Sequence, residues 1–127
     1  MFSLTVDDYV MIAHSLPNEF FGPAQKLHGA TLTVEATFTR PLLNEYSVVL
    51  DIGHATKLLD DVLESLRYAD LDSHPDFEGR LSTSEAIAQY IGDKLAANLT
   101  DMPDIGVSVT IHENPRARVS YTVPDRS

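Results

Sequence analysis

Apolar and polar residues alternate along four segments of the chain, and each alternation predicts a β-strand with one buried face. The alternation is most regular over residues 30–40, where apolar side chains occupy every second position. Residues 4–14 follow the same period, with Asp8 as an interruption. Two shorter strands are predicted near the C-terminus, over residues 107–113 and 117–123, on either side of an Asn114-Pro115 turn.

Two helices are predicted between the second and third strands. The first follows Asp51, a good N-cap residue, and presents one apolar stripe: Leu58, Leu59, Val62, Leu63 and Leu66. The second follows Ser82-Thr83-Ser84-Glu85, which has the form of a capping box in which Ser82 and Glu85 satisfy each other's backbone donors. Polar loops are expected over residues 17–26 and 70–80.

This order of elements, ββααββ, predicts an α+β fold. We expect one domain over residues 1–127, with a four-stranded antiparallel sheet and both helices on one of its faces. The other face and the two sheet edges would be covered if several copies closed their sheets into a shared barrel. The sequence therefore favours a homo-oligomer.

Charge and composition exclude several classes of partner. The formal net charge is −10, and the nine Lys and Arg residues form no cluster, so neither nucleic acid nor an anionic membrane surface is an expected partner. The N-terminal residues lack a basic start and an apolar run, and we expect a cytoplasmic protein. The chain has no cysteine, which removes disulfides and thiol nucleophiles.

Two histidines are candidate metal ligands. His14 ends the first predicted strand and His28 opens the second, and both are in phase with apolar positions. Two imidazoles on adjacent strands can share a zinc ion, although zinc normally takes a third protein ligand. Glu19, His74 and His112 are the candidate third donors. The alternative is that the two histidines bond buried polar groups or water.

Glu113 is a candidate ligand-binding carboxylate. It ends a strand in which Val107, Val109 and Ile111 share its face, and a carboxylate on an apolar face needs a donor pair. The paired N–H groups of a pterin or guanine edge provide such a match. The alternative is an ion pair with Arg116 or Arg118.

These fragments, in this order, resemble the 6-pyruvoyltetrahydropterin synthase and 6-carboxytetrahydropterin synthase family, which has the tunnelling fold (T-fold). The resemblance covers nearly the whole chain. It rests on the following pieces: Ile12-Ala13-His14-Ser15-Leu16, Leu27-His28-Gly29, Asp51, Leu71-Asp72, Ser82-Thr83-Ser84-Glu85, Ile111-His112-Glu113-Asn114-Pro115 and Tyr121.

The resemblance implies a zinc site that departs from the family pattern. Family members hold zinc with one histidine from the first strand and two from a His-Gly-His at the second. His14 and His28 match two of these ligands, and Ala30 stands in the place of the third. The family's nucleophilic cysteine has no counterpart in Pro23-Ala24-Gln25-Lys26.

The resemblance also implies roles in catalysis and substrate binding. Tyr68 occupies a position of the family's Leu-Asp-His relay, which aligns with Leu66-Arg67-Tyr68. Our two further candidate catalytic residues are His74, as a proton relay, and Glu19, as a base in place of the thiol. Glu113 matches the pterin-anchoring glutamate, and Thr83 and Glu85 belong to a segment similar to one that lines the family's pocket. For Glu85 the alternative is helix capping, and for His74 it is a solvated loop.

Two functions follow from the resemblance. The first is a lyase similar to 6-pyruvoyltetrahydropterin or 6-carboxytetrahydropterin synthase, with metal-assisted chemistry on a dihydropterin substrate and diverged catalytic residues. The second is a non-catalytic T-fold module that binds a pterin or a purine-like small molecule. Both imply a homo-oligomer, a trimer or a hexamer.

Overall fold

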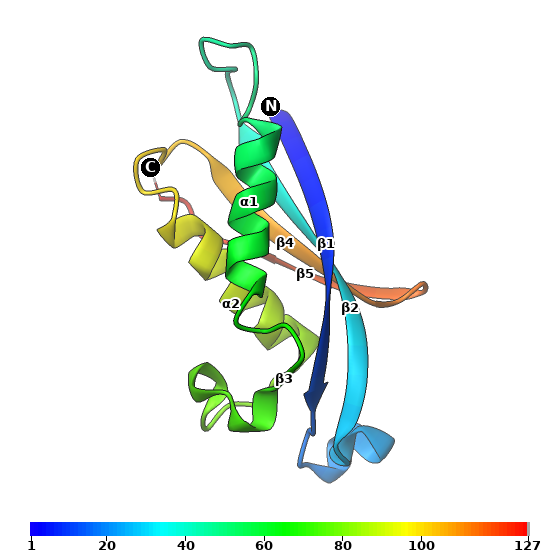
Figure 1. The fold of residues 1–127 in the computed structure, drawn as a ribbon. Helices are drawn as coiled ribbons and strands as arrows, with labels where there is room; N and C mark the ends of the chain where they lie inside the picture. The colour runs from blue at the N-terminus through cyan, green and yellow to red at the C-terminus, as the bar shows by residue number, and fades with distance from the viewer. Residues whose placement is uncertain (127) are drawn as a thin grey trace.

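Two long antiparallel strands form the centre of the structure, a computed structural model that describes residues 1–126 (Figure 1). β1 (Phe2–His14) pairs with β2 (His28–Arg40) along its whole length, from Phe2 opposite Arg40 to His14 opposite His28. β4 (Gly106–Asn114) pairs with β2, and β5 (Ala117–Thr122) pairs with β4, both antiparallel. The four predicted strands are therefore confirmed.

A fifth strand joins the sheet beside β1. β3 (Ala69–Asp70) is only two residues long and pairs in parallel with Ile12 and Ala13. The strand order is thus β3-β1-β2-β4-β5. The sequence did not predict β3, because two residues are too few to show an alternation.

Two helices lie on the same face of the sheet (Figure 1). They are α1 (Ile52–Leu63) and α2 (Ser84–Ala97), and their apolar side chains pack on the inward-facing residues of β1, β2 and β4. Phe38, Val34 and Ile111 from the sheet are fully buried in this core. Short 3-10 helices complete the fold: η1 (Glu19–Gln25), η2 (Leu71–Ser73) and η3 (Pro75–Phe77). None of the helices formed by residues 1–126 is long and apolar enough to cross a membrane.

One of the two helices begins at the expected cap, and the other does not. The predicted N-cap of α1 is confirmed, because the Asp51 carboxylate accepts from the backbone N–H of His54 at 2.9 Å. The predicted capping box of α2 is wrong: Thr83 is the N-cap and accepts from the backbone N–H of Ala86 at 3.1 Å. Helix α2 therefore starts one residue later than the Ser82 motif implied, and the Ser82 side chain is free to bond elsewhere.

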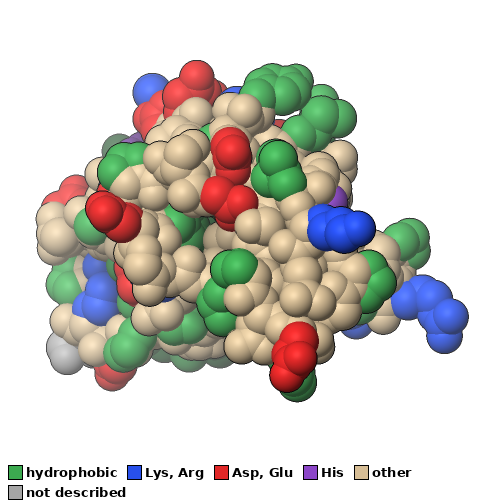
Figure 2. Space-filling view, turned by 90° about the horizontal axis from the view of Figure 1, so that it is seen from below, with side chains coloured by type: hydrophobic (Ala, Val, Ile, Leu, Met, Phe, Trp, Pro, Cys, Tyr) green, Lys and Arg blue, Asp and Glu red, His purple; other side chains and the backbone are tan. Residues whose placement is uncertain are grey.

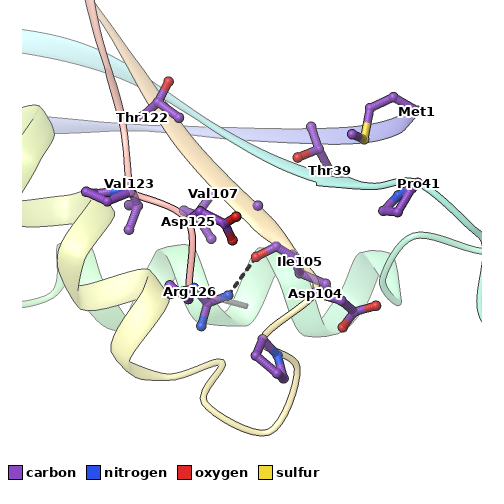
Figure 3. Close-up of a pocket in the computed structure, with 13 residues that line it drawn as sticks. Met1, Thr39, Pro41, Asp104, Ile105, Val107, Thr122, Val123, Asp125 and Arg126 are labelled. Carbon is purple, nitrogen blue, oxygen red and sulfur yellow. Dashed lines mark hydrogen bonds between the residues drawn. The ribbon is translucent and has the colours of Figure 1, made fainter.

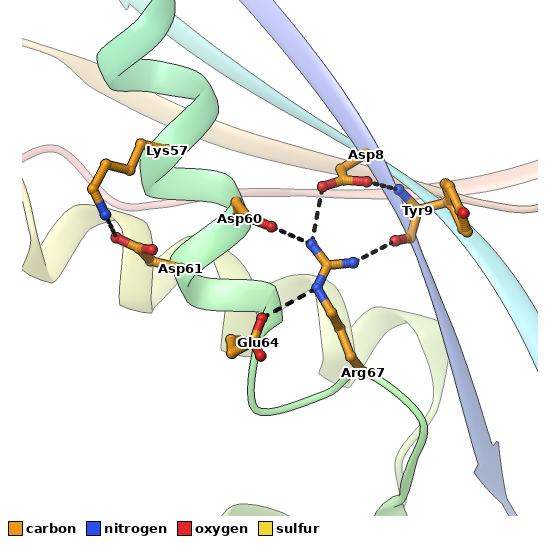
Figure 4. Close-up of polar contacts among 7 residues, drawn as sticks. All are labelled: Asp8, Tyr9, Lys57, Asp60, Asp61, Glu64 and Arg67. Atoms are coloured by element: carbon orange, nitrogen blue, oxygen red, sulfur yellow. Dashed lines mark hydrogen bonds and ion pairs between the residues drawn. The ribbon is translucent and has the colours of Figure 1, made fainter.

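The segment after α1 protects part of the open edge of β1 (Figure 4). Arg67 forms ion pairs with Asp8 on β1 and with Asp60 on α1, and it donates to the carbonyl of Tyr9. The backbone N–H of Tyr68 donates to the carbonyl of Met11 at 2.8 Å. These contacts satisfy strand-edge groups that would otherwise pair with another chain.

A cavity of about 310 Å³ lies at the opposite end of the sheet from His14, under the C-terminal segment (Figure 3). Arg126 lines this cavity, and its guanidinium forms hydrogen bonds within the protein. The Arg126 guanidinium donates to four backbone carbonyls at the end of α2 and in the loop that follows: Ala96, Leu99, Met102 and Ile105. Because an arginine at this position satisfies the orphan carbonyls of the helix end, we assign this region a structural role.

Replacing Gly92 by alanine should destabilise the fold. A Cβ at Gly92 would lie 2.9 Å from the ring of Tyr121, so the packing of α2 on β5 leaves no room for it. We expect a loss of about 1–3 kcal/mol, although alanine is ordinarily favoured over glycine inside a helix by about 1 kcal/mol. Urea unfolding followed by circular dichroism measures the change.

The matched control is Gly29→Ala, whose Cβ would have its nearest neighbour, the carbonyl oxygen of Ile12, at 3.8 Å. This variant should be about as stable as the wild type. A Gly92→Ala protein that is as stable as the control would show that Tyr121 is not packed against the helix.

Candidate functional site

A pocket of about 360 Å³ opens where β1 ends and β2 begins, between η1 and the N-terminus of α2. Figure 2 views the molecule from this end and shows apolar and acidic side chains interspersed, with Lys and Arg scattered. The pocket brings together five residues that the sequence singled out: His14, His28, Thr83, Glu85 and Glu113. The remaining lining residues are Leu16, Phe21, Ala24, Ala30, Leu32, Ser84 and Asn114.

The two histidines face each other because their strands pair in register. His14 and His28 are direct partners across β1 and β2, and their ring centroids are 4.6 Å apart in an edge-to-face arrangement. His14 is buried, with 7% of its surface exposed, and His28 is half-buried. The predicted juxtaposition of two imidazoles is therefore present in the lining of the pocket.

Backbone carbonyls fix the tautomer of both rings. Nδ1 of His14 lies 2.8 Å from the carbonyl oxygen of Ser82, and Nδ1 of His28 lies 2.9 Å from that of Lys26. A carbonyl only accepts, so Nδ1 is the protonated nitrogen in each ring. The neutral rings therefore carry their lone pairs on Nε2, the arrangement found in histidines that bind a metal or accept a proton.

The environment favours the neutral form of His14. Burial lowers the pKa of the His14 imidazole below its ordinary value of 6.5. The hydrogen bond to the Ser82 carbonyl raises this pKa, whereas the neighbouring His28 lowers it further. The net shift is downward, so His14 keeps a free lone pair at neutral pH.

One chain does not supply a complete zinc site around these rings. Within residues 1–126, no group of three or more His, Cys, Asp or Glu side chains is placed to hold a metal. His112 contacts Glu35 away from the pocket lining, and His74 accepts from the backbone N–H of Asp76. Glu19 lies on η1 outside the pocket lining. None of the three candidate donors joins the pair, and we derive no chemical step through a metal.

Glu113 reaches the same pocket from the end of β4. The pairing of β4 with β5 is irregular between His112 and Asn114, and Glu113 at this irregularity is exposed in the single chain. Glu113 follows apolar residues in its strand, as the sequence indicated, but they do not bury its carboxylate in the single chain. Glu113 accepts a hydrogen bond from the hydroxyl of Ser84. Within the described chain it forms no ion pair with Arg116 or Arg118, so its negative charge is not neutralised by arginine.

Three consecutive residues at the start of α2 organise the site. Ser82 is buried and offers both its carbonyl and its hydroxyl oxygen to Nδ1 of His14, at 2.8 and 3.0 Å. Thr83 caps α2. Ser84 is also buried and donates to Glu113. Two side chains from distant strands are thus oriented by one short segment, which is itself fixed by the helix that it begins.

The remaining predicted catalytic residues lie outside the pocket lining. Tyr68 is 81% exposed. His74 packs edge-on against Phe77 and Tyr90 near η3. Together with Glu19, these residues have no contact with the pocket in the single chain. Their catalytic roles stay predictions.

The sequence did not single out Ser82 or Ser84 as site residues, and it indicated Asp72 only within the Leu71-Asp72 piece of the family resemblance. Asp72 accepts from both the backbone N–H and the hydroxyl of Ser15, at 3.0 and 2.7 Å, and so fixes the chain just after His14. The structure shows that Ser82 and Ser84 are both buried at the start of the helix, which the sequence does not reveal. Their partners are too distant in the sequence for a local pattern to reveal them.

The fold is that of a T-fold protein. A family model described as 6-pyruvoyl tetrahydropterin synthase matches residues 3–124, which is most of the chain. The chain belongs to this family. The resemblance inferred from the sequence fragments is therefore confirmed.

Individual relatives agree with this assignment. The chain is 32% identical over 110 residues to the 6-pyruvoyl tetrahydrobiopterin synthase of Drosophila melanogaster, covering 84% of this chain and 65% of that protein. It is 27% identical over 126 residues to the 6-carboxy-5,6,7,8-tetrahydropterin synthase of Bacillus subtilis, covering 94% and 84%. The structure of the Caenorhabditis elegans 6-pyruvoyl tetrahydropterin synthase superposes with a TM-score of 0.86 at 23% identity, covering 96% and 95% of the two chains. This last similarity shows the shared fold.

The lowered pKa of His14 should make the protein less stable in mild acid. Because the unfolded state binds a proton near pH 6.5 and the folded state only at lower pH, stability is lost as the pH falls below about 6.5. One such group contributes a slope of at most about 1.4 kcal/mol per pH unit. His14→Gln should reduce this slope when metal-free protein is unfolded in urea between neutral and mildly acidic pH.

His54→Gln is the control, because His54 is an exposed histidine on α1, away from the pocket. It should leave the slope of the wild type unchanged. If His14→Gln also leaves the slope unchanged, His14 titrates alike in the folded and unfolded chains.

Proposed function

We propose that this chain acts on a dihydropterin-type substrate as a divergent synthase of its family, with Glu113 as the residue that holds the ring. The observation that carries the proposal is the placement of an un-neutralised carboxylate and two imidazole lone pairs in one pocket. A pterin has paired N–H groups on its pyrimidine edge and a substituent on the far side of the bicyclic ring. In this proposal the Glu113 carboxylate contacts the N–H groups of the ring, and His14 and His28 contact the substituent.

Glu113 provides the ring contact. Carboxylates bind two parallel N–H donors with charge-assisted hydrogen bonds, which are stronger than neutral ones. Ser84 donates to one oxygen of this carboxylate and so fixes its orientation without removing its charge. A hydroxyl in this position leaves the carboxylate able to accept from a ligand as well.

The histidines provide the contact with the substituent. Their Nε2 atoms accept hydrogen bonds or protons from a hydroxyl next to the ring, because both Nδ1 atoms are committed to carbonyls. A lyase step on the substituent requires proton transfer at this position, and His14 and His28 are the only titratable nitrogens in the pocket lining.

The second candidate function is a binding module without catalysis. It is favoured by the absence of any cysteine and by Ala30 in the lining, where the resemblance implies a third histidine. The two functions are separated by incubating the protein with 7,8-dihydroneopterin and with its triphosphate and analysing the products by chromatography. Release of a shortened or dehydrated pterin supports the synthase, and tight binding with no product supports the module.

Replacing Glu113 by glutamine should weaken dihydropterin binding by about 10- to 100-fold. The change removes the charge from one side of the ring contact, which is worth about 1.5–3 kcal/mol for a hydrogen bond to a charged group. Isothermal titration with 7,8-dihydroneopterin measures the dissociation constant. Glu45→Gln, in the exposed loop before α1, is the control and should bind like the wild type. Equal affinities for all three proteins would refute the proposed ring contact.

Zinc content should depend on residue 30. Two imidazoles hold zinc weakly, so purified wild-type protein should contain well under one zinc per chain by elemental analysis. Ala30→His adds a third imidazole two residues along β2 from His28, on the same face of the strand, and should raise the content towards one. Thr31→His, on the opposite face, should not. A full equivalent of zinc in the wild type would mean that a donor outside these described contacts completes the site.

A further inference from the structure

Asn114 follows Glu113 directly in the chain, and both residues line the same pocket. Consecutive residues of a regular strand point to opposite faces of a sheet. The pairing of β4 with β5 is irregular between His112 and Asn114, and an extra residue at such a bulge re-aims a side chain. The bulge therefore lets the carboxylate of Glu113 and the amide of Asn114 reach one ligand.

The hairpin turn fixes the orientation of the Asn114 amide. Its Oδ1 accepts from the backbone N–H of Arg116 at 2.8 Å, which is the contact of an Asx turn, and Pro115 between them has a restricted backbone. Since a backbone N–H only donates, it must contact the oxygen of the amide and not the nitrogen. Within residues 1–126 the Nδ2 group forms no hydrogen bond, so its two N–H groups are available to a ligand.

Most other polar side chains of the pocket offer acceptors. The Nδ1 atoms of His14 and His28 are committed to backbone carbonyls, which leaves lone pairs on Nε2. Ser84 donates to Glu113, and Glu85 is a carboxylate, which only accepts when it is ionised. The pocket lining is therefore short of side-chain donors.

One other side-chain donor remains beside the Asn114 amide. Thr83 accepts from the backbone N–H of Ala86, and its hydroxyl can still donate. This hydroxyl lies at the start of α2, whereas Asn114 is the residue next to Glu113. A ligand group beside the atoms that Glu113 holds is therefore closer in the chain to the amide than to the hydroxyl.

We propose that Asn114 donates to the ring carbonyl oxygen of a heterocycle whose neighbouring N–H groups are held by Glu113. This inference rests on the proposed function and adds to it the chemical feature that the ligand must carry. A pterin presents two N–H groups and then a carbonyl oxygen along one edge of its pyrimidine ring. Glu113 and Asn114 offer the complementary order, carboxylate acceptors followed by an amide donor.

The test compares 6-hydroxymethylpterin with its 4-thioxo analogue by equilibrium dialysis. The analogue keeps both N–H groups and the hydroxyl but carries sulfur, a weak acceptor, in place of the ring carbonyl oxygen. We expect the wild-type protein to bind the oxo compound about 2- to 10-fold more tightly, the range for one neutral hydrogen bond. The ratio of the two affinities is the measured quantity, because a change in overall affinity cancels from it.

Two variants at the same position assign the preference to the amide. Asn114→Asp keeps an oxygen that accepts from Arg116, and so keeps the turn, but it removes the N–H donor. The preference for the oxo compound should disappear in this variant and in Asn114→Ala. Asn44→Asp is the matched control and should keep the wild-type preference, because Asn44 accepts from the backbone N–H of Tyr46 at 2.9 Å in an exposed Asx turn outside the pocket.

The outcomes separate this inference from the proposed function. If the wild type binds both compounds equally while Glu113→Gln weakens both, the role of Asn114 is refuted and the proposed function stands. The same holds if the preference persists in both Asn114 variants, because another donor, such as the hydroxyl of Thr83, then binds the oxygen. If neither compound binds to the wild type, or if Glu113→Gln weakens neither, the proposed function is refuted and the role of Asn114 falls with it.

Discussion

The thirteen-residue pairing of β1 with β2 fixes the positions of the site residues on both strands. In this register His14 lies opposite His28, and Ile12 lies opposite Ala30. A slip of one residue would turn Val34 and Phe38, both fully buried, onto the other face of the sheet. Core packing far from the pocket therefore determines that two imidazoles meet at the pocket's edge.

The carboxylate of Glu113 is oriented by a neutral group. An arginine partner would orient it equally well but would also compensate its charge and occupy its second oxygen. The hydroxyl of Ser84 neither compensates the charge nor occupies the second oxygen. The serine is itself buried at the start of α2. The chain thus keeps a negative charge beside the apolar residues Leu16, Phe21 and Leu32 that line the same pocket.

The strands were predictable because each has one buried face. The alternation predicted a strand over residues 30–40, and the structure has β2 over His28–Arg40. The alternation also gave the phase of His14 and His28, which was enough to infer that they meet. It did not reveal η1, whose Glu19–Gln25 segment includes a proline and a glycine with φ of 55° and has no periodic apolar pattern.

The contacts that orient the site residues were not predictable from local pattern. Ser82 matches a capping motif in sequence, yet its oxygens bind His14, which is 68 residues away in the chain. Ser84 binds a partner 29 residues away. Propensity and periodicity describe neighbours along one element, whereas these bonds depend on how α2 docks on the sheet. Arg67 is a further example, because it aligns with a position of the family's relay. In the structure it instead pairs with Asp8 and donates to the carbonyl of Tyr9 at the edge of β1.

The shared support of His14 and Glu113 has a consequence for how their energies combine. Both groups are bonded to the same stretch, residues 82–84, so removing either one also relaxes the support of the other. The contributions of His14 and Glu113 to the free energy of unfolding should therefore be coupled rather than additive, as is usual for members of one hydrogen-bond network. In a double-mutant cycle the two ends of this pocket should behave as a single unit, although they belong to different strands.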